Sequence, residues 1–304
     1  RNFSVDENAN WGVEWVLLGG DTDVIPERLA YTRYYGGEFI PTDMYYSCLD
    51  GSWNADRDSL WGEAFRDNYD PGDDADLYSE VYVGRLPVTG LDQAETLIGK
   101  TLDYITPADS PSKKKFLLLG EVLFPPDWSY GEEPDRDGAE ILNSIYSAHL
   151  EGSSLNTDRL YENYYDYPGS VELNKASAIS YMNGGANHVM HAGHGYKYNM
   201  SVGDAAILNG DAWALSNGDA LFSMFLLNCT NLAFDVNCIA EYFMLNPGGG
   251  AYAVTGSSRS AFPSTFRYYM EGYYDLLFDS GIAELGKLHV GSRVSFTPDR
   301  KSTR

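Results

Sequence analysis

Short apolar runs alternate along this chain with segments in which apolar residues recur at helical spacing. Each run is continuous and ends in a polar or glycine-rich loop, which is typical of a buried strand. Strands are therefore predicted at residues 15–18, 81–83, 116–119, 186–192, 222–228 and 251–255. Helices are predicted at residues 94–105, 141–150, 177–182, 239–245 and 265–278. This alternation indicates an α/β fold with a mostly parallel sheet and helices on both faces.

The length of 304 residues leaves room for two fused α/β subdomains. We expect an N-terminal subdomain over residues 1–110, a catalytic subdomain over residues 111–295 and a flexible tail over residues 296–304. Residues 41–74 break the alternation, because they are rich in Asp, Trp, Tyr and Gly and lack a period. A long acidic insertion is the prediction for this stretch.

The charge of the chain narrows the classes of partner. Forty-four Asp and Glu residues against 21 Lys and Arg residues give a net charge of −23. Such a surface repels nucleic acid and anionic lipid, and it suits bound cations or basic substrates. No run approaches the ~18 apolar residues of a membrane span, and the polar start shows no signal peptide. Any targeting segment is therefore expected to be missing from this sequence.

Reactive side chains follow three of the predicted strands. Glu121 comes after the strand at 116–119, His194 after the strand at 186–192, and Cys229 after the strand at 222–228. Because parallel strands deliver their carboxyl ends to one edge of a sheet, these groups are expected to lie close together. A thiol, an imidazole and a carboxylate form the set that acyl transfer by cysteine needs.

Two other interpretations of these residues stay open. A cysteine after an apolar strand is often a core residue, and Cys48 and Cys238 complete an odd set of three with no disulfide framework. The three-residue spacing of His188, His191 and His194 suggests a zinc site as the second alternative. On a strand, however, His191 would point away from the other two, and a helix would spread the trio over ~120°.

Several segments together resemble the gingipain-type cysteine peptidases, which share a caspase-like fold with caspases, legumain and clostripain. The similar segments span most of residues 13–290. They are LLGGD at 17–21, YVGR at 82–85, HAGHG at 191–195, LLNCTNLAF at 226–234, NCIAE at 237–241 and GAYAVTGSS at 250–258. Any one of these motifs is weak, but six in the same order form a specific pattern.

The resemblance implies roles for the residues at the strand ends. Cys229 matches the nucleophile and His194 the general base, and the N–H groups of Gly195 and Cys229 match the oxyanion hole. Glu121 matches an acidic residue near the base, so we expect it to orient His194. Its alternative role is that of a solvated loop carboxylate.

The resemblance also implies substrate and metal residues. Asp135 matches the carboxylate that binds the substrate side chain, which predicts cleavage after Arg, with Lys second; its alternative role is to cap the next helix. Phe262 lies near the aromatic lid of that pocket. Structural Ca²⁺ is predicted at Asp21, Asp76, the carbonyl of Tyr78 and Glu80, against the alternative of a solvated acidic loop.

The leading hypothesis is thus a secreted cysteine endopeptidase that acts on polypeptides and uses no organic cofactor. The alternatives are a calcium-stabilised adhesion module without activity and a zinc hydrolase built on His188, His191 and His194. The family's first strand–helix unit and its immunoglobulin-like domain have no counterpart here. We therefore expect an excised piece that ends at Arg304 by self-cleavage and that pairs with a second fragment of the same precursor.

Overall fold

The computed structural model describes residues 1–64, 72–75, 78–106 and 110–296. The chain forms two compact units, one from Arg1–Thr89 with Tyr268–Arg304 and one from Gly90–Arg267. Each unit has its own sheets, and the predicted tail beyond residue 296 lies outside the described residues.

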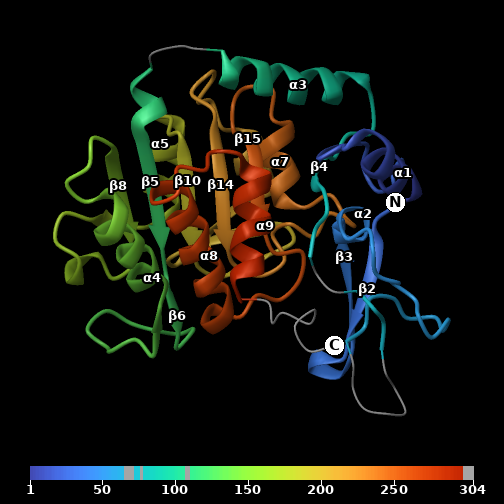
Figure 1. The fold of residues 1–304 in the computed structure, drawn as a ribbon. Helices are drawn as coiled ribbons and strands as arrows, with labels where there is room; N and C mark the ends of the chain where they lie inside the picture. Colours follow the sequence, from blue (N-terminus) through green and yellow to red (C-terminus); the bar gives the residue numbers. More distant parts are fainter. Residues whose placement is uncertain (65–71, 76–77, 107–109, 297–304) are drawn as a thin grey trace. The chain divides into compact units, whose positions relative to one another are not determined.

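A six-stranded sheet forms the centre of the second unit (Figure 1). Every pair of neighbouring strands in it is parallel, which confirms the predicted α/β class. In sheet order its strands are β15 (Ala251–Gly256), β14 (Phe222–Leu227), β10 (His188–Ala192), β5 (Lys115–Gly120), β8 (Asn156–Tyr161) and β9 (Val171–Glu172). The sequence pattern did not predict β8 and β9, because β8 carries polar residues at Asn156, Asp158 and Arg159.

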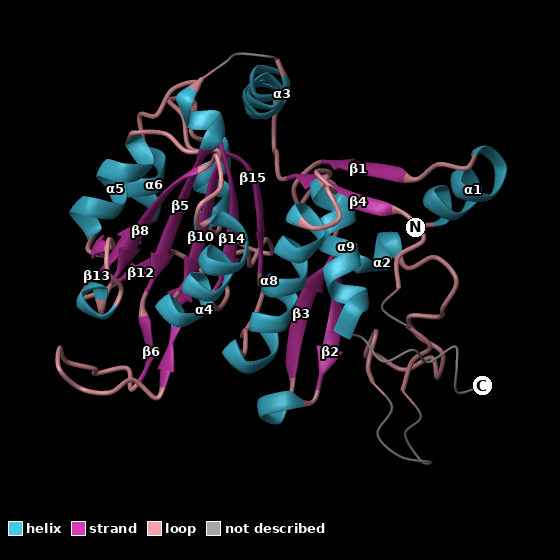
Figure 2. Cartoon of the chain, turned by 60° about the vertical axis from the view of Figure 1, so that its left-hand side comes forward, coloured by secondary structure: helices cyan, strands magenta, loops and turns pink. Residues whose placement is uncertain are grey.

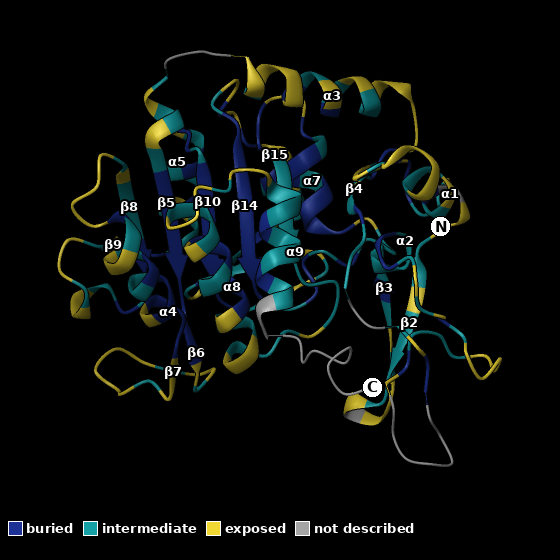
Figure 3. Cartoon of the chain, in the orientation of Figure 1, coloured by how far each residue is buried: buried dark blue, intermediate teal, exposed yellow. Residues whose placement is uncertain are grey.

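Helices cover both faces of this sheet (Figure 2). One face carries α5 (Lys175–Asn183), α6 (Asn209–Trp213) and α7 (Ile239–Leu245), whose apolar side chains join Leu117 and Leu119 in the main core. The opposite face carries α4 (Gly138–Ile145), which packs on β5 and β10. The central strands β5, β10 and β14 are consequently buried along nearly their whole length (Figure 3).

Two small sheets of the second unit extend from the carboxyl edge of the large one. The hairpin of β6 (Val122–Phe124) and β7 (Arg136–Asp137) follows β5 directly. The sheet of β11 (Gly195–Tyr196), β12 (Asn199–Val202) and β13 (Ala205–Leu208) follows β10. Both additions therefore begin where the predicted catalytic residues leave the sheet.

The first unit contains two pairs of five-residue strands. The parallel pair is β1 (Trp15–Gly19) with β4 (Tyr82–Leu86), and the antiparallel pair is β2 (Arg28–Thr32) with β3 (Glu38–Thr42). Its helices are α1 (Asn2–Trp11), α2 (Met44–Ser47), α9 (Leu285–Phe296) and the later part of α8 (Pro263–Phe278). In the predicted insertion at 41–74, the described residues after Ser47 form bends and irregular loop.

The units divide the chain at other positions than the predicted subdomains. Helix α3 (Leu91–Ile105) belongs to the second unit because the ammonium of its buried Lys100 donates to the carbonyls of Phe243, Met244 and Ala251. Helix α9 belongs to the first unit because it packs on β4. Among the described residues, no helix has the length and apolarity that crossing a membrane requires.

Candidate active site at the carboxyl edge of the sheet

Glu121, His194 and Cys229 leave the sheet side by side. The register pairs Ala192 of β10 with Gly120 of β5 on one side and with Leu227 of β14 on the other. The pairing continues beyond the strands, since Glu121 N–H donates to the Ala192 carbonyl (2.9 Å) and Gly193 N–H donates to the Leu227 carbonyl (3.1 Å). The structure thus brings the three predicted catalytic residues to one edge.

The imidazole of His194 is oriented by a main-chain carbonyl. Its Nε2 lies 2.9 Å from the carbonyl oxygen of Leu123 in β6. The Phe124 ring packs edge to face against the imidazole, with 6.0 Å between the ring centroids. A carbonyl can only accept, so we assign the proton to Nε2 and the lone pair to Nδ1. The Nδ1 atom can therefore take up a proton. Leu123 was not predicted, because every residue carries a main-chain carbonyl and the sequence does not show which one binds a side chain.

The buried carboxylate of Glu121 holds main chain rather than the imidazole. Its Oε2 accepts from His194 N–H (2.7 Å), and its Oε1 accepts from Gly203 N–H (2.8 Å). Burial raises the pKa of Glu121 to about 7, against the opposing effect of hydrogen bonds from Ser201, His194 and Gly203. Glu121 therefore positions the backbone that carries His194, and the orienter of the ring is Leu123.

The thiol of Cys229 is half-buried beside the loop that joins β15 to α8. Its Sγ lies 3.4 Å from the N–H of Ala261 and 3.6 Å from the Ala261 carbonyl. The next residue, Thr230, has φ of 55°, a conformation that is strained for a β-branched side chain. The bend at residues 228–230 thus follows directly after the end of β14 at Leu227. Phe262, the predicted lid, directly follows Ala261 and is half-buried.

The predicted oxyanion residue Gly195 opens β11 next to His194. A Cβ atom at this position would lie 2.8 Å from Asn231 Nδ2 and 3.0 Å from Asn228 Cγ. A side chain at position 195 would therefore displace these two buried amides. The main-chain N–H of Gly195 therefore stays next to the end of β14.

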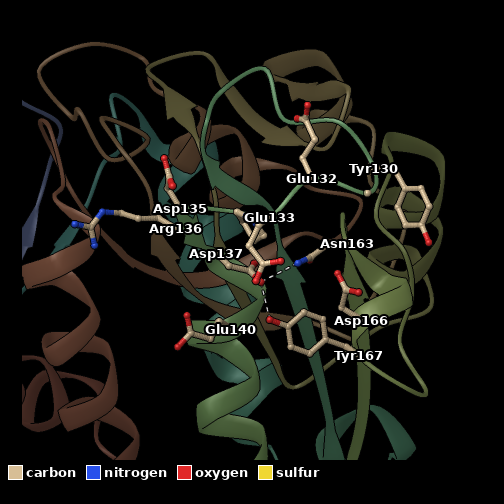
Figure 4. A pocket seen from close by; sticks show the side chains of 12 residues that line it. Tyr130, Glu132, Glu133, Asp135, Arg136, Asp137, Glu140, Asn163, Asp166 and Tyr167 are labelled. Atoms are coloured by element: carbon tan, nitrogen blue, oxygen red, sulfur yellow. Dashed lines mark hydrogen bonds between the residues drawn. The ribbon is translucent and has the colours of Figure 1, made fainter.

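A cavity of about 430 Å³ lies over the β6–β7 hairpin and the segment after β8 (Figure 4). Asp135, whose side chain is exposed, is one of its lining residues, and the Asp135 N–H donates to the Phe124 carbonyl (2.9 Å). Arg136 is the cation among the lining residues. The carboxylates that line the cavity are Glu132, Glu133, Asp135, Asp137, Glu140 and Asp166.

Asp137, not Asp135, caps the helix that follows. Its Oδ1 accepts from Ala139 N–H (2.7 Å) at the start of α4. Its Oδ2 accepts from Asn163 Nδ2 (2.8 Å) and from the Tyr167 hydroxyl (2.6 Å), as Figure 4 shows. Both oxygens of Asp137 are thus occupied within the protein, whereas the side chain of Asp135 faces solvent.

The predicted calcium ligands lie in the first unit, except that Asp76 falls outside the described residues. Glu80 accepts from Leu49 N–H (2.6 Å), and its carboxylate lies within 4.8 Å of ligand atoms of Asp50 and Cys48. Asp21 is buried and accepts from Thr22 N–H (2.7 Å). The hard oxygens of Glu80 and Asp50 fit Ca²⁺, and Asp50 is a neighbour that the sequence did not indicate.

The three histidines do not form a zinc site. His188 binds the Ser223 hydroxyl through Nδ1 (2.6 Å), and His191 binds the Ser201 carbonyl through Nε2 (2.8 Å). Burial lowers the pKa of His188 to about 3 and that of His191 to about 4, so both rings are neutral. None of the three-residue groups of potential metal ligands found among the described residues includes any of the three.

Comparisons with known proteins agree with this geometry. A model of peptidase family C25 matches residues 1–303. The Arg-specific cysteine proteinase gingipain R is 19% identical with a TM-score of 0.72, over 96% of this chain and 61% of that one. A complex of the pro- and mature domains of Porphyromonas gingivalis RgpB is also 19% identical, with a TM-score of 0.68, over 97% and 62%. These structures establish the fold as gingipain-like and hence caspase-like.

A curated relative extends the comparison to archaea. An uncharacterized protein of Archaeoglobus fulgidus is 24% identical over 197 residues, which are 64% of this chain and 41% of that one. The chain therefore spans less than two thirds of the proteins that it matches.

The ionisation of Glu121 should be visible in the stability of the protein. Its folded pKa of about 7 exceeds the unfolded value of about 4.3, so the folded protein binds the proton more tightly. The stabilisation is complete below about pH 4.3 and is lost as pH rises to about 7. The free energy of unfolding can be measured in urea at several pH values. Between pH 4.5 and pH 8, that of wild type should fall by about 3 kcal/mol relative to that of Glu121→Gln.

An exposed acid provides the control for that experiment. Glu133→Gln, on the β6–β7 hairpin, should give a nearly constant difference from wild type over the same pH range. A constant difference for Glu121→Gln as well would show that Glu121 is ionised throughout, with its two N–H donors outweighing its burial.

Proposed function

This chain belongs to peptidase family C25, and from that premise we propose that it is a cysteine endopeptidase. The observation that carries the proposal is the shared sheet edge, where Cys229 and His194 emerge from adjacent parallel strands. The tautomer that Leu123 imposes on His194 supports the assignment, because it leaves Nδ1 as the base. His188 and His191 argue against a zinc hydrolase, because each ring is hydrogen-bonded to a group of the protein.

The proposed reaction uses the thiol and imidazole in turn. His194 Nδ1 takes the thiol proton of Cys229, and Sγ attacks the scissile carbonyl carbon. The N–H groups of Gly195 and Cys229 stabilise the oxyanion, each donor contributing about 2.7–4 kcal/mol. The imidazolium then protonates the leaving amine, which gives a thioester. Water, deprotonated by His194, hydrolyses the thioester and restores the thiol.

Substitution of the two catalytic residues tests this function. Cys229→Ala and His194→Ala should each lower kcat/KM on a peptide reporter by about 10³-fold or more. Cys238→Ala is the matched control, since Cys238 is a fully buried thiol. Iodoacetamide should modify half-buried Cys229 first and abolish activity in step. Folded wild type that cleaves no reporter would indicate the binding module instead.

We further propose that the enzyme prefers Arg, then Lys, at the cleaved bond. The cavity beside the β6–β7 hairpin supports this preference, because six carboxylates and one guanidinium line it. Asp135 offers a solvent-facing carboxylate to a guanidinium, whereas the oxygens of Asp137 are already occupied. A guanidinium and a carboxylate pair through two parallel hydrogen bonds, which favours Arg over Lys.

Reporters that end in Arg, Lys, Leu or Asp test the preference. Asp135→Asn should lower kcat/KM for the Arg reporter about 10-fold or more, because it removes a charge-assisted pair of about 1.5–3 kcal/mol. Its melting temperature should not change, since the side chain is exposed. Asp137→Asn should instead lower the melting temperature through the lost helix cap. Wild-type preference for Leu or Asp would contradict the proposal.

We also propose that the protein is secreted and that Ca²⁺ stabilises its first unit. Asp21, Glu80, the carbonyl of Tyr78 and Asp76 would hold the ion, with Asp50 as an additional oxygen donor. The closeness of Asp50 to Glu80 supports a cation site at these two residues of the set. When bound, the ion would neutralise the clustered carboxylates and tie the loop after α2 to the start of β4.

Removal of Ca²⁺ provides the test. A chelator should lower the melting temperature of wild type, since Ca²⁺ at 100 times its dissociation constant stabilises by about 2.7 kcal/mol. Added Ca²⁺ should restore the melting temperature, and added Mg²⁺ should not. Glu80→Ala should start from a lower melting temperature and respond little to either treatment. An unchanged wild-type melting temperature would refute a structural ion.

A further inference from the structure

His191, a neutral histidine of β10, has two hydrogen-bond partners from different parts of the site. His191 in β10 is fully buried. Its Nε2 lies 2.8 Å from the Ser201 carbonyl in β12, and its Nδ1 lies 3.0 Å from Nδ2 of Asn228. Asn228 directly precedes Cys229. The ring of His191 therefore connects the residue before the nucleophile to the small sheet that begins at Gly195.

A second amide continues this connection. Asn228 Nδ2 also donates to Asn231 Oδ1 (2.6 Å). Asn231 Nδ2 in turn donates to the carbonyls of Tyr196 (2.5 Å) and Asn199 (2.6 Å). Both asparagines are almost completely buried. The contacts join the turn at Cys229 to both strands of the β11–β12 hairpin, from which Gly195 offers its N–H.

The network also lies in direct contact with Gly195. The space that a Cβ of Gly195 would need is occupied by Asn231 Nδ2 at 2.8 Å and Asn228 Cγ at 3.0 Å. A shift of either asparagine would thus move the main chain of Gly195 relative to Cys229.

We propose that His191 is a positioning residue, which acts through Asn228 and Asn231 to keep the Cys229 turn and the Gly195 N–H at the spacing that catalysis needs. This inference rests on the proposed peptidase function and assigns no chemical step to His191. It adds three buried polar residues to the groups that position the proposed catalytic residues.

Only a neutral histidine fits the polarity of this position. The Ser201 carbonyl needs a donor, and the Asn228 amide needs an acceptor on the opposite side of the ring. The Nε2–H tautomer supplies both, while an imidazolium would direct an N–H at the amide hydrogens of Asn228. Burial lowers the pKa of His191 to about 4, with a smaller effect in the same direction from the neighbouring His194. The buried carboxylate of Glu121 and the ring of His191 both lie against Gly193, since a Cβ there would be 2.3 Å from Glu121 Oε2 and 2.7 Å from His191 Nε2.

An apolar residue at position 191 would leave two buried polar groups without partners. The simplest relief is a movement of the asparagines toward new partners, and a displacement of about 1 Å at a reacting centre can lower the rate about 100-fold. Binding of the substrate elsewhere would be affected much less. The two kinetic constants should therefore respond differently.

His191→Leu and His188→Leu form a matched pair for the test. Both histidines are buried in β10 and neutral, but His188 binds Ser223 at the start of β14, far along the strand from Cys229. At a temperature well below both melting points, His191→Leu should lower kcat about 10- to 100-fold with KM within about 2-fold. His188→Leu should lower the melting temperature similarly and leave kcat within about 2-fold of wild type.

A conservative variant covers the case in which His191→Leu does not fold. His191→Asn keeps an acceptor within reach of Asn228, so it should keep more of kcat than His191→Gln, whose amide can reach only Ser201. Equal kcat in the histidine variants and wild type would overturn the proposal. A kcat loss in His188→Leu as large as in His191→Leu would overturn it as well.

A readout without peptide substrate separates this proposal from the peptidase function. Imidazole ¹⁵N spectra of wild type from pH 5 to 8 should show His191 neutral with its proton on Nε2; an Nδ1–H tautomer would overturn the network. If wild type cleaves no reporter, only the proposed function fails. The alkylation rate of Cys229 by iodoacetamide then replaces kcat, and an equal rate in His191→Leu and His188→Leu would refute positioning.

Discussion

Parallel pairing of β5, β10 and β14 is the constraint on which the rest of the site depends. Parallel strands present their carboxyl ends together, and the continuous apolar runs of these strands can be buried only with helices on both faces. Residues that follow the strands must then leave the sheet at one edge, where Glu121, His194 and Cys229 lie. The proposed chemistry is local to that edge, while the packing that stabilises the edge comes from the helices on both faces of the sheet.

Main-chain groups buried at this edge need hydrogen-bond partners, and polar side chains supply them. Loops that leave a buried sheet carry main-chain N–H and carbonyl groups out of reach of water, and each needs a partner. Glu121 satisfies the N–H groups of His194 and Gly203, and Asn231 satisfies the carbonyls of Tyr196 and Asn199. The groups that satisfy the backbone are therefore the same groups that fix the catalytic residues, so packing and positioning share one set of contacts.

Sequence patterns could predict what depends on a residue's own chemistry and its place along a strand. The apolar runs located β5, β10, β14 and β15, and the strand ends located Cys229 and His194. They could not predict Leu123, whose carbonyl orients His194, because every residue carries a carbonyl. Nor could they decide between Asp135 and Asp137 as the helix cap, since both precede α4 within three residues and only the register of β7 with β6 separates them.

The β6–β7 hairpin links the pocket to the imidazole. Leu123 at its start binds Nε2 of His194, Asp135 near its end lines the acidic cavity, and Asp137 closes it by capping α4. Gly138 then lies so close to the sheet edge that a Cβ there would meet the Ala192 carbonyl at 2.3 Å. Both ends of the hairpin are therefore held at the sheet edge, next to His194. One short piece of chain thus carries both the residues of the proposed specificity pocket and the carbonyl that orients His194.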